Sequence, residues 1–354
     1  MSEALAFRLT GVARLGDAAG MLDQICEHFV EHADVERMGA SAVLRSHGGT
    51  ASMRLHDEKL LIDLACSSQD ELEITRTSIA EHMFFFAGTD PLDLEWSKPA
   101  ARGLPNLHHV TVAGVEDITP RMRRVTFFCA DVAPFIGGEM HVRVLVPPKG
   151  REPVWPSYRA DGRVAWPDGD AALVVRPYTI RFVDRDKRQL AIDVFQHTVP
   201  GIATPGGDFA RDACVGDRLA LVGPGSGSLP CADDILLIGD ESALPAIARI
   251  AAEVPAGTRM RAIVEVQDKA EEQPLPSAAT IELHWLHRSR YPDEAGLLRE
   301  QALAAIEAST DGTYVWAACE KDDIRVIRSL LKRRGHDKKR MYVAWYWERQ
   351  QPVG

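Results

Sequence analysis

The segment RPYTIR, residues 176–181, places two guanidinium groups, a phenol and a hydroxyl within six residues. Side chains alternate in direction along an extended segment, so Arg176 and Tyr178 share one face while Thr179 lies on the other. Arginine forks onto phosphate oxygens, tyrosine offers a stacking face, and threonine offers a hydroxyl to a ring nitrogen. The segment therefore fits a diphosphate attached to a flat ring system, and it equally fits an ordinary barrel strand with surface charges.

The sequence around this segment is rich in strand patterns and carries no strong helical pattern. Such a run predicts a small closed antiparallel barrel of six strands within a domain at residues 105–230. The strands are expected at residues 108–115, 123–129, 141–146, 174–183, 189–195 and 217–222. Residues 147–172 interrupt the barrel as a long loop, which is either functional or held against the barrel by its aromatic side chains.

From residue 233 the pattern changes to alternating strands and helices. Alternation of this kind predicts a parallel sheet with helices on both faces, here a domain at residues 233–349. The strands are expected at residues 235–238, 261–266, 281–286, 314–318 and 341–346, and the helices at 243–254, 297–306 and 323–331.

Residues 1–95 predict a separate α+β domain with the order β-α-β-β-β-α. Ser68 and Glu71 have the spacing of a capping box at the start of the second helix. No cluster in this domain carries obvious chemistry. A polar stretch punctuated by Pro91, Pro99 and Pro105 predicts a linker to the barrel.

The composition excludes several classes of protein. A formal net charge of -10 argues against nonspecific nucleic-acid binding. No apolar run approaches the length needed to span a bilayer, and the start of the chain lacks the features of a signal peptide, so we expect a cytoplasmic protein without membrane insertion. The six cysteines form no C-x-x-C pair, which argues against a zinc ribbon, and no metal site is expected.

A second polar region begins where the first strand of the parallel sheet ends. The turn at residues 239–242 is expected to present free N–H groups and the positive end of a helix dipole to an anion. No G-x-G-x-x-G pattern is present, so this is not the common dinucleotide fingerprint. A nucleotide site and a plain helix cap formed by Asp240 or Ser242 are equally consistent with the turn.

Together these segments resemble the siderophore-interacting proteins, which are flavin-dependent ferric-siderophore reductases of the ferredoxin-reductase superfamily. The resemblance covers residues 105–349. It rests on RPYTIR at 176–181, on GDESALPAI at 239–247, and on YVWAA at 314–318 with Tyr346-Trp347. The first 95 residues resemble a small domain of unassigned function that is sometimes fused to this family.

The resemblance implies cofactors and site residues. FAD is expected to contact the barrel segment and the loop after it, at Arg176, Tyr178, Thr179, Arg181, His197, Gly201, Ala203 and Thr204. NADH or NADPH is expected against Gly239, Asp240, Glu241, Ser242, Ala243, Leu244 and Pro245. Thr179 is the expected catalytic residue, because its hydroxyl would tune the flavin ring. Cys319 and Trp345 stand where the family usually has glycine, and both would crowd the nicotinamide.

The substrate site is harder to locate from the sequence. Anionic ferric chelates favour cationic pockets, and a basic stretch at residues 332–334 and 338–340 precedes the last strand. A solvated helix end, with cations complementing the helix dipole, explains the same stretch. Trp155 and Trp166 in the long loop are further candidates.

The sequence therefore predicts a cytoplasmic FAD-dependent enzyme that reduces a ferric siderophore and releases Fe(II), with electrons from NAD(P)H. Asp268 and Arg288 favour NADH and NADPH respectively, and a reduced ferredoxin is the third candidate donor. The alternatives are a flavoprotein oxidoreductase with another donor or acceptor, and a non-redox protein that binds the ferric siderophore.

Overall fold

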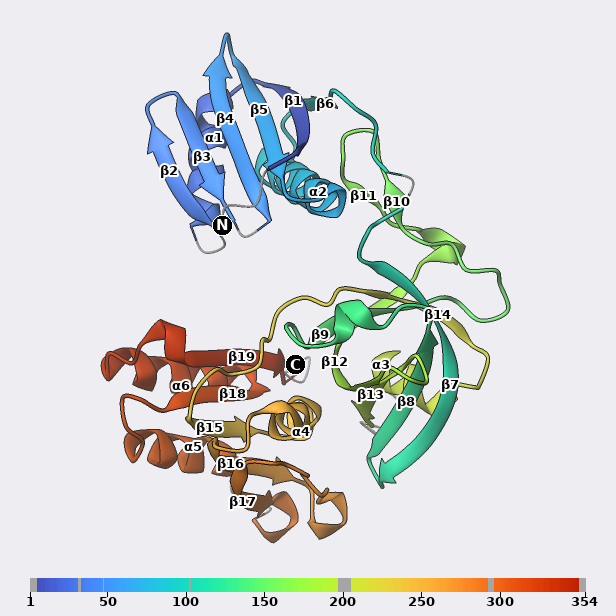
Figure 1. Ribbon diagram of the computed structural model, residues 1–354, viewed down its shortest axis with the longest axis vertical. Helices are drawn as coiled ribbons and strands as arrows, with labels where there is room; N and C mark the ends of the chain where they lie inside the picture. The colour runs from blue at the N-terminus through green and yellow to red at the C-terminus, as the bar shows by residue number, and fades with distance from the viewer. Residues whose placement is uncertain are drawn as a thin grey trace, which may run out of the picture. The chain divides into compact units, whose positions relative to one another are not determined.

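The chain forms two compact units, which Figure 1 shows as a ribbon. One unit comprises Met1–Leu107 with Gly150–Ala172, and the other comprises His108–Lys149 with Leu173–Gly354. The structure, a computed structural model, describes residues 5–30, 33–46, 48–101, 103–196, 205–291 and 296–349.

The first unit is built on an antiparallel sheet in the order β2-β3-β4-β5-β1-β6. Its strands are β1 (Phe7–Leu15), β2 (Asp34–Met38), β3 (Ser41–Arg45), β4 (Gly49–His56), β5 (Lys59–Cys66) and β6 (Leu92–Trp96). Two helices, α1 (Ala18–Phe29) and α2 (Gln69–Ala87), pack on one face of the sheet. Alternate residues of the strands point into the layer between sheet and helices, as the period of two requires.

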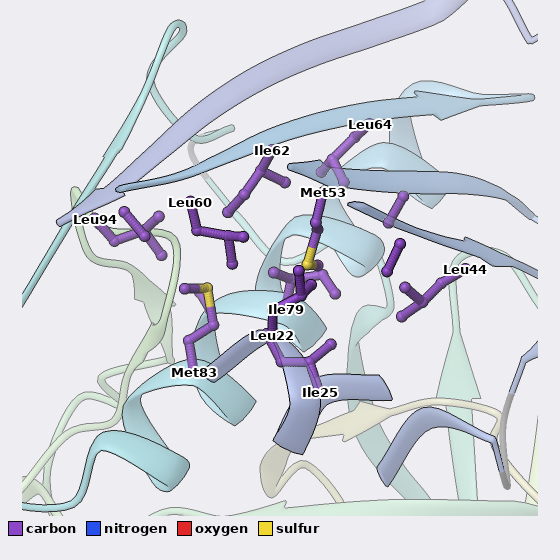
Figure 2. Close-up of a cluster of buried hydrophobic side chains, with 14 of the residues drawn as sticks. Leu22, Ile25, Leu44, Met53, Leu60, Ile62, Leu64, Ile79, Met83 and Leu94 are labelled. Atoms are coloured by element: carbon purple, nitrogen blue, oxygen red, sulfur yellow. The ribbon is translucent and has the colours of Figure 1, made fainter. Parts of the chain in front are cut away.

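Figure 2 shows the core of this unit, where aliphatic side chains from the sheet meet those of both helices. Leu22 and Ile25 come from α1, and Ile79 and Met83 come from α2. Ser68 caps α2 by accepting a hydrogen bond from the Glu71 N–H at 3.1 Å, as the capping-box spacing predicts.

The long loop predicted at residues 147–172 contains a short hairpin. Strands β10 (Ser157–Tyr158) and β11 (Val164–Ala165) pair antiparallel, and the segment Gly150–Ala172 belongs to the first unit although the flanking strands belong to the barrel. We call Gly150–Ala172 the insertion.

The barrel of the second unit is closed and has the order β12-β13-β8-β7-β14-β9. Its strands are β7 (Leu107–Thr119), β8 (Met122–Cys129), β9 (His141–Val146), β12 (Val174–Asp184), β13 (Gln189–Phe195) and β14 (Arg218–Val222), with helix α3 (Pro205–Asp212) between the last two. Its interior is filled by valine, isoleucine, leucine and phenylalanine side chains.

A parallel sheet in the order β17-β16-β15-β18-β19 follows the barrel. Its strands are β15 (Asp234–Gly239), β16 (Arg259–Val266), β17 (Thr280–His287), β18 (Tyr314–Glu320) and β19 (Met341–Trp347). Helix α4 (Leu244–Glu253) packs in one core, and α5 (Leu297–Glu307) and α6 (Lys321–Arg333) pack in the other. Ile235 and Leu237 enter the first core while Leu236 and Ile238 enter the second, so both faces of β15 are covered.

The predicted fold class is confirmed: an α+β region is followed by a closed six-strand antiparallel barrel and a parallel-sheet domain. Two edge strands were absent from the prediction. β2 is polar and largely exposed, so it shows no alternation, and β6 lies in the stretch that its prolines predict as linker. The predicted domain boundaries stay predictions. Among the described residues no helix has both the length and the apolar character required to cross a membrane.

Candidate functional site

The centre of the candidate site is a hydrogen-bonded chain that runs through Thr179. Thr179 on β12 pairs in register with His141 on β9, and the Thr179 Oγ1 lies 3.2 Å from the His141 Nδ1. The other ring nitrogen, Nε2, lies 3.0 Å from the Tyr346 hydroxyl and 3.4 Å from the Tyr342 hydroxyl. Residues from the barrel and from the last strand of the parallel sheet therefore share one polar network.

Burial fixes the protonation state of this network. It lowers the pKa of His141 to about 4, with the nearby Arg249 guanidinium adding to the effect, and it raises the pKa of Tyr346 well above its usual value. The imidazole is neutral at physiological pH, so one of its nitrogens donates and the other accepts. Gly227, with a φ of +72°, lies so close that a Cβ there would be 2.3 Å from the His141 Nε2.

Arg249 joins helix α4 to the strand that carries the RPYTIR segment. Its guanidinium is buried and donates to the backbone oxygens of Ile180 and Phe135, each at 3.1 Å, and to the Glu253 carboxylate at 3.0 Å. A buried arginine with all of its neighbours as acceptors is stable only where the surrounding backbone is fixed. This contact therefore fixes β12 against the α/β domain.

Two arginine side chains of the RPYTIR segment retain unused polar capacity. Among the described residues, the exposed Arg176 guanidinium bonds only to the Val175 backbone oxygen. The Nε of Arg181 is buried and has no hydrogen-bond partner in the part of the chain that the structure describes, and it lies 3.8 Å from an Asp193 carboxylate whose stronger bonds go to Arg124. Burial lowers the pKa of Arg181. Buried donors of this kind are normally satisfied, so the segment has capacity for an anionic ligand.

Tyr178 lies against the start of helix α3. Its burial raises the pKa of the phenol to about 12, and a Cβ on Gly206 would be 2.1 Å from its hydroxyl oxygen. The backbone at Gly206 therefore approaches the phenol as closely as only glycine permits. Together with the two arginines, this arrangement fits a ligand that combines phosphate with a ring system.

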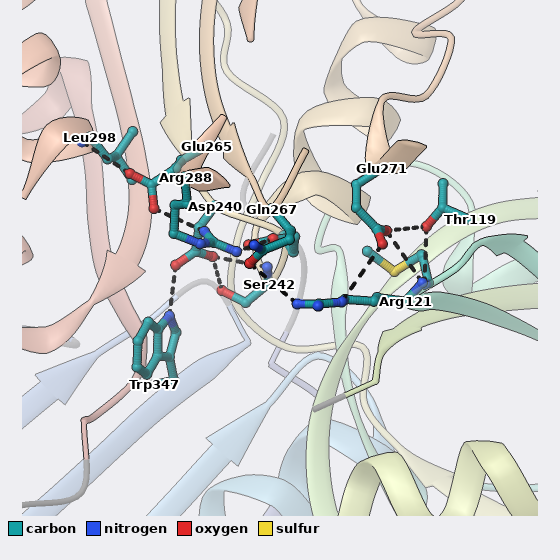
Figure 3. Close-up of polar contacts among 12 residues, drawn as sticks. Thr119, Arg121, Asp240, Ser242, Glu265, Gln267, Glu271, Arg288, Leu298 and Trp347 are labelled. Carbon is teal, nitrogen blue, oxygen red and sulfur yellow. Dashed lines mark hydrogen bonds and ion pairs between the residues drawn. The ribbon is translucent and has the colours of Figure 1, made fainter. Parts of the chain in front are cut away.

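The turn at residues 239–242 differs in part from its prediction, because the Asp240 side chain already binds Ser242 (Figure 3). The Asp240 Oδ1 accepts from the N–H of Ser242 at 2.9 Å and from its hydroxyl at 2.5 Å, and the Asp240 backbone oxygen accepts from the N–H groups of Ala243 and Leu244. The Asp240 Oδ2 accepts from the Trp347 Nε1 at 2.7 Å. The N–H groups of Ser242, Ala243 and Leu244 are thus used locally, since Asp240 caps the turn.

Glu241 is buried in an ion pair rather than presented to a ligand. It pairs with Arg288, whose second arm donates to Glu265 at 2.9 Å (Figure 3). Burial raises the pKa of Glu241, an effect that the Arg288 guanidinium opposes. Arg288 is already shared by two carboxylates and is not a free cation for a 2′-phosphate, contrary to the expectation drawn from its sequence position. Asp268 caps a short 3₁₀ turn through the N–H of Ala270.

The remaining positions of this motif serve packing. A Cβ on Gly239 would be 2.5 Å from the Ala243 Cβ and 3.0 Å from the Ala318 oxygen, so glycine lets the turn approach β18. Ala243, Leu244 and Pro245 are buried at the start of α4. The predicted loop residues His197, Gly201, Ala203 and Thr204 lie outside the described residues.

The other candidates from the sequence do not gather at the site. The Cys319 side chain is fully buried, and the Trp345 side chain is 50% exposed with the Lys321 ammonium 5.6 Å from its ring. Within the basic stretch, Arg334 and Arg340 donate to the backbone oxygens of Ser309 and Gly312, as expected at helix and strand ends. Trp155 and Trp166 lie on the insertion, in the first unit.

A polar joint connects the barrel to the α/β domain beside the turn. The buried Glu271 accepts from the Thr119 hydroxyl at 2.5 Å and from the Arg121 N–H at 3.3 Å, and the Arg121 side chain reaches the Gln267 amide oxygen at 3.3 Å (Figure 3). A buried carboxylate is retained at a joint only when its oxygens are satisfied in this way. The joint gives the two domains of this unit a defined contact.

Sequence reasoning missed His141, Arg249 and Glu271. His141 begins a predicted strand and has no polar neighbour in the sequence, so only its pairing with Thr179 reveals it. Arg249 lies in the apolar pattern of a helix, and a charged residue at a core position of that pattern is the signal that was available. A separate cavity of about 1000 Å³ lies in the first unit, and none of the predicted site residues lines it.

Comparison with known proteins assigns the second unit. A family model described as "Siderophore-interacting FAD-binding domain" matches residues 111–228, and one described as "Siderophore-interacting protein" matches residues 232–350. A siderophore utilization protein from T. fusca is 36% identical, with 69% of this chain and 93% of that chain covered and a TM-score of 0.58.

The chain belongs to the siderophore-interacting protein family. Another solved member, SipS from Aeromonas hydrophila, is 26% identical over 69% of this chain and 99% of its own, with a TM-score of 0.55. The ferric vibriobactin reductase ViuB of Vibrio cholerae is 27% identical over 241 residues, which cover 66% of this chain and 86% of ViuB. Residues 10–97 match a family model described as "Uncharacterized protein conserved in bacteria", which assigns no activity to the first unit.

Proposed function

We propose that this protein is a flavoenzyme that reduces a ferric siderophore, with FAD held by the barrel. The observation that carries the proposal is the RPYTIR strand, where the side chains of Arg176 and Arg181 retain unused polar capacity inside a domain that matches an FAD-binding family model. The reductase names of two relatives, ferric vibriobactin reductase and ferric acinetobactin reductase, support the same reaction.

In this proposal Arg176 and Arg181 bind the phosphates of FAD, and Tyr178 packs on its ring systems. A bound flavin accepts two electrons as hydride and passes them on singly, as Fe(III) requires. Gly206 keeps helix α3 close to Tyr178, and the undescribed loop residues predicted from the sequence, His197, Gly201, Ala203 and Thr204, complete the proposed set.

Thr179 and His141 act together in the proposed site. The Thr179 side chain is 5% exposed, and its hydroxyl is oriented by the neutral imidazole of His141. An oriented hydroxyl offers one defined hydrogen bond to a ring nitrogen and tunes its electron affinity without transferring a proton. Tyr346 binds the other ring nitrogen of His141, with its hydroxyl 3.0 Å from the Nε2.

We further propose NADH or NADPH as donor and Fe(II) release as the outcome, in the cytoplasm. Lowering the charge of iron weakens its hold on hard oxygen ligands, so the chelator gives up the metal after reduction. The nucleotide is proposed to approach the turn at residues 239–245. Because Asp240 and Trp347 bond to each other there, binding requires that hydrogen bond to be exchanged for one to the ligand.

The test is anaerobic reduction followed by reoxidation. Purified protein reconstituted with FAD is expected to bleach on addition of NADH or NADPH, and the flavin absorbance is expected to return on mixing with a ferric siderophore. The gallium(III) complex of the same chelator is the control, because Ga(III) binds alike but accepts no electron. Two outcomes would contradict the proposal. The protein could fail to bind FAD, or ferric siderophores could reoxidise the reduced flavin no faster than unrelated oxidants do.

The outcomes also separate the alternatives. A flavoprotein with another acceptor would be bleached by nucleotide without selective turnover of ferric chelates. A non-redox binding protein would show the same change in its fluorescence with the iron and the gallium complexes, and it would leave the iron oxidised. A reduced ferredoxin as physiological donor would bleach the flavin where both nucleotides fail.

A further inference from the structure

The N-terminal part of the first unit binds the middle of the insertion through backbone groups of residues 161–164. The Trp96 indole N–H donates to the Asp161 oxygen at 2.8 Å, the Thr77 hydroxyl donates to the Gly162 oxygen at 3.1 Å, and the Glu81 carboxylate accepts from the Val164 N–H at 2.8 Å. Side chains of α2 and β6 thus satisfy three backbone polar groups of one turn from another part of the chain. Backbone groups recognised one by one in this way indicate a built binding site.

The turn is shaped for this contact. Gly162 is buried with a φ of +91°, and a Cβ there would be 2.9 Å from the Trp96 Nε1 and 3.2 Å from the Arg76 Cγ. Asp161 binds the Arg163 guanidinium at 2.7 Å, and that guanidinium lies 3.5 Å from the centre of the Phe84 ring. Only glycine fits at the point of closest approach, since both the conformation and the space exclude a side chain.

The insertion also covers charges on helix α2. The side chain of Arg76 is 1% exposed and pairs with the equally buried Glu73. The Tyr158 ring lies 5.1 Å from the Arg76 guanidinium, and burial raises the pKa of its phenol, with Thr77 as a hydrogen-bond partner. Tyr158 and Gly162 of the insertion both lie against Arg76, so the insertion helps to bury this ion pair.

The covalent path connects this contact to the proposed flavin strand. The insertion lies between β9, which ends at Val146, and β12, which begins at Val174, and these two residues pair directly. Arg176 follows two residues later, and Thr179 bonds to His141 across the same pair of strands. A long connection between two neighbouring strands carries a large conformational entropy unless something orders it.

We propose that the N-terminal domain is an intramolecular docking module whose ligand is the turn at residues 159–164, and that docking restrains the β9–β12 strand pair. Its partner is a segment of this same chain, recognised through its backbone and a glycine. The domain thereby orders a loop that enters and leaves the barrel beside the RPYTIR segment, and it gives the uncharacterised first unit a structural role in flavin binding.

The test uses the full chain and hydrogen-exchange mass spectrometry of peptides that cover residues 155–167. Gly162→Ala is expected to speed exchange there at least tenfold, and the milder Thr77→Val severalfold, because it removes one hydrogen bond to the turn. Gly150→Ala is the matched control: it has a φ of +76° in the same insertion, but no atom lies within 4 Å of its Cβ position. Unchanged exchange in Gly162→Ala would overturn the docking.

The restraint on the strands is read from the Kd for FAD and therefore rests on the proposed function. Gly162→Ala and Thr77→Val are expected to weaken FAD binding severalfold, while Gly150→Ala leaves it unchanged. Faster exchange with an unaltered Kd would overturn the restraint. A wild-type protein that binds no FAD would refute the proposed function instead, and the exchange rates would still decide whether the turn is docked.

Discussion

The two polar motifs of the second unit differ in how their side chains are satisfied. On β12, Arg176 bonds only to its neighbour's backbone and Arg181 retains a buried unpaired N–H among the described residues. In the turn at residues 239–242, Asp240 and Glu241 use their side chains on Ser242, Trp347 and Arg288. The RPYTIR strand, which we call the open motif, has N–H donors without hydrogen-bond partners among the described residues. In the turn at residues 239–242, which we call the closed motif, the side chains of Asp240 and Glu241 already have partners.

This difference indicates how each motif meets a ligand. On β12 an arriving anion can accept hydrogen bonds from arginine N–H groups that have no hydrogen-bond partner among the described residues, so no existing hydrogen bond has to be broken. A closed turn must exchange an existing bond for each new one, so its net gain is small. We therefore expect tight, lasting flavin binding at β12 and weak, reversible nucleotide binding at the turn.

The largest expected effect, on the Kd for FAD, comes from removing two proposed ligand-binding side chains of the RPYTIR strand. Replacing Arg176 and Tyr178 together by alanine removes a charge-assisted phosphate contact and an aromatic face, at a cost of about 3 to 4 kcal/mol. The Kd for FAD should rise roughly 100- to 1000-fold, measured by fluorescence titration of the reconstituted protein.

Two further variants guard this experiment. Arg176→Ala alone changes an exposed side chain and should weaken FAD without affecting folding. Arg185→Ala removes another exposed arginine, in the turn after β12, and should leave the Kd unchanged. If the double variant and the wild type contain equal amounts of flavin, Arg176 and Tyr178 do not bind FAD.

An intermediate effect concerns the network between the two motifs. The pKa of His141 is lowered from 6.5 to about 4 in the folded chain, so the unfolded state binds more protons between these pH values. The free energy of unfolding should therefore fall by up to about 3 kcal/mol as the pH drops from 6.5 to 4, and level off below that. His141→Gln should flatten this part of the curve, measured by urea unfolding at a series of pH values.

The control is His56→Gln, an exposed histidine at the end of β4, whose variant should follow the wild-type curve. If the free energy of unfolding falls as steeply between pH 6.5 and 4 in His141→Gln as in the wild type, the buried His141 imidazole is not the cause of this pH dependence.

The smallest expected effect, on the KM for the nucleotide, comes from removing a hydrogen bond at the turn at residues 239–242. Trp347→Phe keeps an aromatic ring but removes the 2.7 Å bond to Asp240, so nucleotide binding no longer has to break it. A typical hydrogen bond is worth about 1 kcal/mol, which predicts a roughly fivefold lower KM for NADPH or NADH in anaerobic flavin reduction. Trp345→Phe, two residues earlier and half exposed, is the matched control. If both variants behave as the wild type, the nucleotide does not meet this turn.

Much of the fold could be predicted because its signals are local. Alternation along β12 and the strand-to-helix rhythm after residue 233 predicted the barrel and the parallel sheet, and the Ser68–Glu71 spacing located the start of α2. The edge strands β2 and β6 were missed, because a polar edge strand is defined by its neighbour and not by its own sequence.

The state of the site's polar groups could not be predicted. The sequence suggested free N–H groups at residues 239–242, where Asp240 binds the Ser242 N–H within the turn, and an available cation at Arg288, which pairs with Glu241 and Glu265 from distant parts of the chain. Whether a polar group is satisfied depends on which residues folding brings within about 3 Å, and a linear motif does not contain that information.

The sequence by itself determined the class of each element, the order of the domains and the residue types that could bind a flavin. Only the tertiary structure brought His141 to Tyr346, 205 residues away, and seated Gly162 against Trp96. The reason is physical: periodicity and spacing follow from local backbone geometry, whereas burial, pairing and protonation follow from contacts that exist only once distant segments have packed together.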